Sequence, residues 1–374
     1  MLIAVAIVVL VVASLWFHFS SPWFTTPLAS NWQRMDDTLT ITFVMTGIFF
    51  VVINLFLAYM VWRFRHREGP HVGHRAAYQP HNKKLEWWLI GVTSVGIVAL
   101  LAPGLLVYAD YVRPPHDALV LEVIGQQWQW RFRFAGASAK FGGSDPRFVT
   151  AANPLGLDPA DATGQDNIVV DGNEVHLPIN RPVRVVARSN DVLHDFFVPP
   201  FRARMNIVPG MVSSFWFTPT RAGRFEAMCA QLCGVGHPNM HGYVVVESEA
   251  AFDAWLRTQP TFAMTMRAPA TAAGASPATQ GQALAQSKGC LACHSVDGSV
   301  RVGPSWQGLY GKTETMADGS TALVDDAYLK SFIREPSARV VKGFAPIMPK
   351  IELADAELDA LVAYIRSQGK APAN

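Results

Sequence analysis

Two long apolar stretches limit what this chain can fold into. Thr38–Trp62 and Trp87–Ala109 contain no Asp, Glu, Lys or Arg. Each is long enough to cross a hydrocarbon layer of roughly 30 Å as a helix. We therefore predict a transmembrane hairpin in residues 36–112, with spans at about 38–62 and 87–109.

The loop between these spans gives the hairpin an orientation. It carries one acid, Glu68, against the basic residues Arg63, Arg65, Arg67, Arg75, Lys83 and Lys84. Short loops rich in Lys and Arg stay in the cytoplasm. The chain from about residue 113 onward is then expected outside the cytoplasm, which is the periplasm if the membrane is a bacterial inner membrane.

Another apolar stretch, Leu2–Phe19, opens the segment 1–35. It is either a further transmembrane helix or a signal peptide. A signal peptide has a basic start and a small-residue cleavage site; no basic residue precedes Arg34, although Pro27-Leu-Ala-Ser30 is a candidate site. We favour an uncleaved helix, and the sequence leaves the alternative open.

Composition agrees with a membrane-anchored globular protein. Half of the residues are hydrophobic and 16% are charged, and the mean hydropathy is +0.17. These values are too apolar for a soluble protein and too polar for one wholly embedded in a membrane. The net charge of +2 comes without a long basic run outside the one loop, so nucleic-acid binding is not expected.

Residues 113–257 change to short β-branched or aromatic segments, which predict a β-sandwich or barrel. A Gly-, Pro-, Asp- and Asn-rich insertion from Phe141 to Asp166 is expected to be a long surface loop. The expected strands lie near residues 118–124, 128–134, 183–187, 213–217 and 242–247.

The remainder divides into a linker and a helical domain. Residues 258–280 are mostly Ala, Pro, Thr and Ser, which is typical of a flexible linker. Residues 281–374 carry helical signals. The clearest is a last helix with an apolar face of Leu358, Leu361, Val362 and Ile365.

Cys290-Leu-Ala-Cys293-His294 is a C-x-x-C-H sequence. In this pattern two thiols attach covalently to haem and the adjacent imidazole binds the iron. The alternatives are a redox dithiol, which needs a thioredoxin-like βαβ pattern, and half of a zinc site, which needs two more ligands nearby. Neither context is present, so the sequence predicts covalent haem c with His294 as an axial ligand.

An electron-carrying haem needs a second axial ligand, and a thioether raises its potential. The candidates in this domain are Met316, in a Gly- and Asp-rich loop, and Met348, in an apolar run before the last helix. The domain resembles class I cytochromes c, and that resemblance implies Met348. The pair Gly303-Pro304 resembles the family segment that packs against the proximal histidine.

A second cluster of metal ligands lies upstream. Cys229, Cys233, His237 and Met240 fall within one short stretch, and His194 is available from an earlier segment that we expect to end a strand. Soft sulfur with imidazole favours copper, and a mononuclear blue-copper site needs only one Cys. The additional thiolate indicates two copper ions bridged by two sulfurs. A disulfide beside an unrelated histidine, or a zinc site, would leave Met240 without a role.

Together, the two spans, the strand Trp128-Gln-Trp130, the copper segments and the haem domain resemble subunit II of haem-copper cytochrome c oxidases in its fused, caa-type form. The resemblance implies a membrane protein with two or three N-terminal helices, an all-β cupredoxin Greek-key domain and an all-α cytochrome c domain. It also implies a dinuclear CuA site. In that site Cys229 and Cys233 bridge, His194 and His237 are terminal ligands, Met240 is axial to one copper, and the carbonyl of Gln231 binds the other.

The resemblance assigns two further positions. Trp128 matches the tryptophan at which electrons enter CuA, although one tryptophan of a pair on the same strand face is usually core. Glu86 matches a glutamate at the entrance of a proton pathway, although an acid at a membrane boundary is often only interfacial. Many relatives carry Glu where Gln231 stands, and that carboxylate binds magnesium. A neutral amide is a poorer magnesium ligand, so the sequence leaves undecided whether this chain binds magnesium.

The function implied is electron input to a proton-pumping terminal oxidase. Electrons would pass from a donor cytochrome or bc-type complex through haem c and CuA to the haem of catalytic subunit I, which reduces dioxygen to water. No catalytic residue is expected in this chain, because an oxygen-reducing centre of haem and copper needs several histidines in the membrane. His18 is the only histidine in any predicted span. The alternatives are the electron-input subunit of a copper-containing nitric oxide reductase and a copper chaperone, which would have no use for Met240 or covalent haem.

Overall fold

The computed structural model describes residues 1–20, 26–65, 81–150, 153–170, 172–267, 276–351 and 353–369. The chain divides into two compact units. One comprises residues 1–28 and 32–113, and the other comprises residues 29–31 and 114–374.

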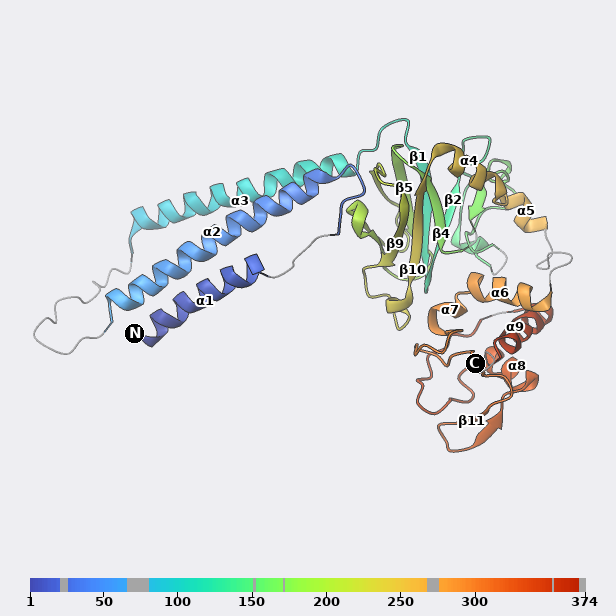
Figure 1. Cartoon of the computed structure of the whole chain (residues 1–374). Helices are drawn as coiled ribbons and strands as arrows, with labels where there is room; N and C mark the ends of the chain where they lie inside the picture. The colour runs from blue at the N-terminus through green and yellow to red at the C-terminus, as the bar shows by residue number, and fades with distance from the viewer. Residues whose placement is uncertain are drawn as a thin grey trace, which may run out of the picture. The chain divides into compact units, whose positions relative to one another are not determined.

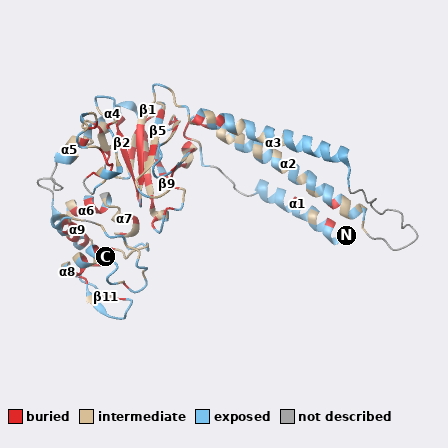
Figure 2. Ribbon diagram, turned by 180° about the vertical axis from the view of Figure 1, so that it is seen from behind, coloured by how far each residue is buried: buried red, intermediate tan, exposed pale blue. Residues whose placement is uncertain are grey.

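The described residues of the first unit form three helices, α1 (Leu2–Ser20), α2 (Gln33–Arg63) and α3 (Lys83–Tyr111) (Figure 1). All three are long and apolar enough to cross a membrane. Most of their side chains are exposed in the isolated chain (Figure 2), as expected for surfaces that face lipid or other membrane helices. The predicted helices are therefore confirmed, whereas residues 66–80 of the basic loop lie outside the described residues.

Polar contacts at helix ends organise the hairpin of α2 and α3. Arg34 Nη1 lies 2.5 Å from Asp110 Oδ2, and the ring of Trp32 meets that of Tyr111 edge-on at 5.3 Å. These contacts join the start of α2 to the end of α3. At the opposite end, the Asn82 side chain accepts the Leu85 N–H and caps α3.

The second unit begins with two five-stranded sheets. Their neighbouring strands run β3-β2-β1-β5-β8 in one sheet and β4-β10-β9-β6-β7 in the other, and only the pairs β1–β5 and β4–β10 are parallel. In chain order the strands are β1 (Leu119–Gln126), β2 (Gln129–Phe134), β3 (Ile168–Val170), β4 (Glu174–Pro178), β5 (Val183–Ser189), β6 (His194–Val198), β7 (Ala203–Ile207), β8 (Ser213–Phe217), β9 (Gly223–Cys229) and β10 (His241–Glu247).

The core of this domain lies between the two sheets. Trp130 of β2 meets Phe196 of β6 edge-on at 5.1 Å, and alternate residues of β10 are buried, as a half-buried strand requires. Figure 2 shows the buried ribbon concentrated in these strands. The result is the predicted cupredoxin-like sandwich. The five predicted strands are present, whereas β3, β4, β6, β7 and β9 were not anticipated.

The insertion from Phe141 to Asp166 is more packed than a surface loop. It contains two short 3-10 turns, Pro146–Phe148 and Ala162–Gly164. Leu155 and Leu157 are buried in a small cluster with Ile124 and Phe262. The Asn153 side chain donates to the Leu157 carbonyl and accepts the Leu157 N–H, which fixes the loop locally.

The stretch expected to be a linker is partly structured. Helix α4 (Glu249–Thr258) is followed by a short helix α5 (Phe262–Arg267). Phe262 is buried, its N–H donates to the Asn167 carbonyl, and Thr261 forms a β-bridge with Ile168. The expected linker 258–280 therefore begins too early, because the buried Phe262 ring and the backbone contacts beside it attach this segment to the sandwich.

The C-terminal region is helical, as predicted. It contains α6 (Pro277–Ser287), α7 (Cys290–Cys293), a hairpin of β11 (Thr313–Thr315) and β12 (Thr321–Leu323), α8 (Asp326–Arg334) and α9 (Asp355–Ser367). Because α6 begins at Pro277, the predicted linker, which extends to residue 280, also ends too late. Helices α6 and α9 pack so closely that a Cβ on Gly281 would lie 2.0 Å from the Ala360 carbonyl oxygen. The predicted apolar face of α9 is buried.

A short segment from the N-terminal part of the chain belongs to the sandwich. The Ala29 N–H donates to the Pro200 carbonyl at 2.7 Å, and the Ala29 carbonyl accepts the Thr220 N–H at 2.9 Å. The Ser30 hydroxyl donates to the Phe201 carbonyl at 2.7 Å. Residues 29–31 thus lie against the sandwich although α2 and α3 separate them from it in sequence.

Candidate metal centres

Three adjacent strands bring the copper-type ligands together. Cys229 ends β9 and His241 begins β10, so the loop between these antiparallel strands holds Cys233, His237 and Met240. Phe196 of β6 pairs with Cys229, which places His194 beside the same loop. His194 begins β6; the expectation that it ends a strand is wrong, because the strand follows the ligand.

The ligand atoms converge in a buried cluster. The two Sγ atoms lie 3.6 Å apart. Cys229 Sγ is 4.0 Å from His194 Nδ1 and 3.2 Å from the Gln231 carbonyl oxygen. Cys233 Sγ is 3.7 Å from His237 Nδ1 and 3.9 Å from Met240 Sδ. The fold therefore assembles every ligand that the sequence predicts for this site.

These distances suit metal binding. Sulfur and nitrogen ligands held tetrahedrally at roughly 2.0–2.3 Å from an ion lie roughly 3.5 Å from each other. His194, Cys229 and Cys233 are all buried, and their ligand atoms lie within 4.8 Å of one another. Both cysteines are free thiols. Soft sulfur with imidazole and thioether fits copper.

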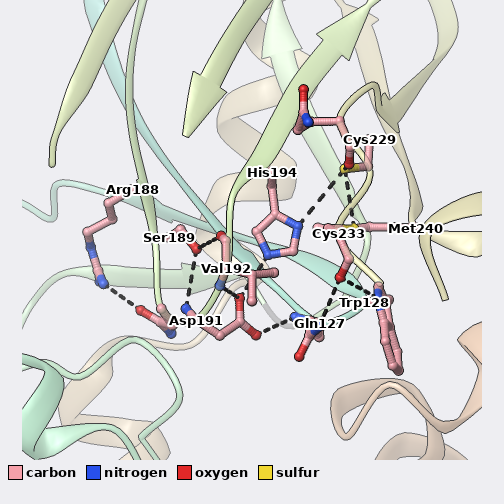
Figure 3. A network of polar contacts seen from close by, with 12 residues as sticks. Gln127, Trp128, Arg188, Ser189, Asp191, Val192, His194, Cys229, Cys233 and Met240 are labelled. Carbon is pink, nitrogen blue, oxygen red and sulfur yellow. Dashed lines mark hydrogen bonds and ion pairs between the residues drawn. The ribbon is translucent and has the colours of Figure 1, made fainter. Parts of the chain in front are cut away.

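The orientation of His194 is set by Asp191. The Oδ1 atom of Asp191 lies 2.8 Å from Nε2 of the imidazole, so Nδ1 faces Cys229 (Figure 3). Burial favours the neutral ring, but the contacts with Asp191 and Cys229 outweigh it and raise the pKa of His194 to about 8. A carboxylate behind a ligating histidine fixes its tautomer and plane.

The two thiols titrate as a pair. Hydrogen bonding from Cys233 lowers the pKa of Cys229 to about 3, and the same contact together with burial raises the pKa of Cys233. In the metal-free protein the two cysteines thus share one proton. A bound cation would take the place of that proton and leave both groups as thiolates.

Trp128 lies directly on the ligand loop. Its Nε1–H donates to the Cys233 carbonyl at 3.2 Å, and the Gln127 side chain donates to the same oxygen at 2.8 Å (Figure 3). A Cβ on Gly236 would lie 2.3 Å from Trp128 Cδ2, so the loop needs glycine there. Sequence reasoning singled out Trp128 but missed Gln127 and the role of Asp191, which is marked only by its position three residues before His194.

The C-x-x-C-H residues lie on α7 at an apolar cavity. The cavity has about 1350 Å³ of empty volume, including space open to solvent at its mouth. Its walls include Cys290, Cys293, His294, Leu329, Ile347, Met348, Leu361 and Ile365. The cavity, with two thiols and an imidazole on its wall, fits a covalently bound haem.

The two candidate methionines have different surroundings. Met348 is half-buried and lines the cavity. Met316 is 2% exposed, packs in the domain core, bridges to Val341 and is not among the cavity residues. The geometry therefore favours Met348 as the thioether that faces a haem.

The proximal histidine is held as the resemblance implies. His294 Nδ1 donates to the Pro304 carbonyl at 2.7 Å, which leaves Nε2 for a metal. A Cβ on Gly303 would lie 2.6 Å from His294 Cε1, so the chain passes the ring too closely for any other residue. Glu86, the other predicted position, lies in the first turn of α3 within the first unit.

Comparisons with known proteins agree with both domains. A family model described as "Cytochrome C oxidase subunit II, periplasmic domain" matches residues 119–249, and the cytochrome c family model matches residues 278–369. The alternative cytochrome c oxidase subunit 2 of Bradyrhizobium diazoefficiens is 51% identical over 262 residues, which cover 70% of this chain and 93% of that protein.

Two more distant relatives are both named cytochrome c oxidase subunit 2. Cytochrome c oxidase subunit 2 of Cereibacter sphaeroides is 30% identical over 264 residues, covering 67% of this chain and 84% of that protein. That of Alkalihalophilus pseudofirmus is 22% identical over 346 residues, covering 91% of this chain and 89% of that protein.

The fold and the two sites define a membrane-anchored electron-transfer protein with a copper domain and a cytochrome c domain. The chain belongs to the cytochrome c oxidase subunit 2 family. It is thus an electron-input component of an oxidoreductase complex, works with catalytic subunit I, and carries domains that imply CuA copper and haem c. These relatives give no support to a nitric oxide reductase.

Proposed function

We propose that this chain is the electron-input subunit of a caa-type, proton-pumping terminal oxidase in a bacterial inner membrane. Its donor is a cytochrome or a bc-type complex, and its acceptor is the haem of catalytic subunit I, where dioxygen is reduced to water. When bound, haem c and CuA each take up and release single electrons. The chain's own residues hold, orient and shield these two centres.

One observation carries this proposal. Two Sγ atoms 3.6 Å apart are surrounded by His194 Nδ1, His237 Nδ1, Met240 Sδ and the Gln231 carbonyl oxygen. A mononuclear site needs one thiolate fewer. The second thiolate supports a dinuclear centre, which Cys229, Cys233, His194, His237, Met240 and the Gln231 carbonyl would hold together.

In the cytochrome domain, we assign covalent attachment to Cys290 and Cys293 and axial ligation to His294 and Met348. The Pro304 carbonyl supports this assignment, because it accepts from His294 Nδ1 and leaves Nε2 to face a metal. The cavity walls are mostly apolar, which together with a thioether ligand favours a high reduction potential.

Trp128 is proposed as the electron-entry residue of the copper domain. Its indole N–H donates to the Cys233 carbonyl, so the ring is one hydrogen bond from a ligand backbone. Glu86 is proposed at the entrance of a proton pathway, since it lies in the first turn of α3, directly after Lys83 and Lys84. Gln231 offers an amide where a magnesium ligand would be a carboxylate, and we therefore do not assign magnesium to this chain.

We also propose domain limits. The N-terminal helix and the transmembrane hairpin occupy residues 1–35 and 36–112. The copper domain extends from residue 113 to the end of α5 at Arg267, and the cytochrome domain begins with α6 at Pro277.

Metal analysis of the detergent-purified full-length protein tests the proposal. We expect two copper ions per covalent haem, and an electron paramagnetic resonance (EPR) spectrum with the hyperfine pattern of one unpaired electron shared by two coppers. The variant Cys233→Ser should lose that pattern. One copper per haem, or zinc, in the unaltered protein would refute the dinuclear assignment.

A further inference from the structure

The indole of Trp306 stacks, with an offset, on the imidazole of His294. Their ring centroids are 5.2 Å apart and their planes differ by 24°. Trp306 is 5% exposed and lines the same cavity as His294. The tryptophan therefore covers one face of the proposed axial ligand.

Two other contacts of the imidazole lie near Nδ1. Nδ1 donates to the Pro304 carbonyl, and the backbone at Gly303 passes beside Cε1 and Nδ1. One hydrogen bond fixes the position of one ring atom but permits the ring to tilt about the bond. A flat partner on the ring face removes that freedom.

Trp306 is itself firmly held. Its backbone N–H donates to the Ser295 carbonyl at 2.8 Å, so it is attached to the residue that follows His294. Its ring meets Tyr364 of α9 edge-on, with centroids 6.0 Å apart and planes at 84°. Tyr364 is 6% exposed and would contact a Cβ on Gly281 of α6. The indole is thus backed by the closely packed helices α6 and α9.

We infer that Trp306 is a positioning residue for His294: the stacked indole holds the imidazole in one plane, so that the ligand keeps the same orientation when the haem is oxidised and when it is reduced. Partners that orient a metal ligand tune the metal as well as bind it. The inference rests on the proposed haem attachment at Cys290 and Cys293.

EPR spectra of the oxidised full-length protein test this inference, because the g values of a low-spin ferric haem report the orientation of its axial ligands. Trp306→Leu keeps an apolar side chain but removes the flat partner. We expect a shifted and broadened low-spin signal and a changed midpoint potential. Trp306→Phe keeps a ring over the imidazole and should retain a sharp signal close to that of the unaltered protein.

A matched control separates positioning from core packing. Val362 is 2% exposed in the same hydrophobic cluster but is not among the cavity residues. Val362→Ala should lower the melting temperature and leave the g values unchanged. If Trp306→Leu behaves in the same way, with lower stability and an unaltered spectrum, Trp306 is only a core residue and the inference is wrong.

Two further results remain informative. If Trp306→Leu does not accumulate, Tyr364→Leu removes the support behind the indole and should shift the same signal less. An unchanged spectrum in Tyr364→Leu would then overturn the inference. If the unaltered protein carries no covalent haem, the proposed function of the domain fails first, which is a different outcome.

Discussion

Asp191 and His194 form a carboxylate–imidazole pair behind the copper ligands, with Oδ1 and Nε2 2.8 Å apart. The second carboxylate oxygen accepts the Gln127 N–H at 2.7 Å. Asp191 therefore connects a proposed metal ligand to the backbone of Gln127, the residue before Trp128. The proposed electron-entry residue and the metal site share one positioning group.

Replacing Asp191 with Ala should weaken copper binding by roughly 10- to 100-fold, the usual effect of removing a group that orients a ligand. Titration against a copper chelator of known affinity measures the change. Asp117→Ala, which alters an exposed acid, is the control and should bind copper normally. Equal affinities in the two variants would show that His194 does not need its carboxylate.

Replacing Gln231 with Ala should retain both coppers and the EPR pattern. The reason is that the atom near Cys229 is the backbone carbonyl oxygen, which every residue possesses. Met240→Leu, by contrast, removes a side-chain sulfur and should alter the spectrum. Loss of copper in Gln231→Ala would mean that the amide itself is a ligand.

The two methionines of the cytochrome domain should respond differently to truncation. Met348→Ala should keep the covalent haem, abolish the sulfur-to-iron absorption band near the red edge of the spectrum, and lower the midpoint potential. Met316→Ala should keep the band but lower the free energy of unfolding by about 2–5 kcal/mol, because Met316 is buried in the core. The reverse pattern would exchange the two assignments.

Adding a methyl group at Gly236 should displace Trp128, since the new Cβ would lie 2.3 Å from the indole. We expect Gly236→Ala to slow electron entry into the copper centre, measured by stopped-flow reduction. At Gly143 a Cβ would be 3.7 Å from Asp161 Oδ2, an ordinary contact, so Gly143→Ala is the control. Equal rates in the two variants would contradict the proposed role of Trp128.

The stability of the metal-free protein should depend on His194. Its pKa is raised from the ordinary value of 6.5 to about 8. Protonation therefore stabilises the folded state fully below pH 6.5, and this stabilisation is lost as the pH rises through 8. Chemical denaturation at several pH values should show the loss in the apoprotein but not in His194→Gln. A flat profile in the unaltered apoprotein would exclude the effect.

The site residues that lie close together in the sequence are the ones that the sequence predicts best. Cys229, Cys233, His237 and Met240 occupy one loop, and the C-x-x-C-H residues one turn, so their spacing indicates the chemistry directly. The contacts of Gln127 and Trp128 with the Cys233 carbonyl depend instead on how strands far apart in the chain are aligned. No local pattern encodes that alignment.

Composition predicts the wrong structure for a segment when one residue decides whether that segment packs against the sandwich. Residues 258–280 are rich in Ala, Pro and Thr, yet Phe262 buries its ring beside Leu155 and Leu157 and organises α5. A similar effect packs the polar insertion, where Asn153 supplies the hydrogen bonds that irregular backbone lacks. Averages over a window do not register one buried side chain.

The hydrogen bonds of Ala29 and Ser30 with the sandwich have a consequence for how the protein is inserted into its membrane. These residues precede α2, and the sandwich follows α3, so both ends of the hairpin must emerge on the same side. The chain must therefore cross the membrane an even number of times between residues 29–31 and the sandwich. This conclusion does not depend on the charge of the loop between α2 and α3. The sandwich is therefore complete only when residues 29–31, which are synthesised long before the ligand loop, lie on the same side of the membrane as the later strands.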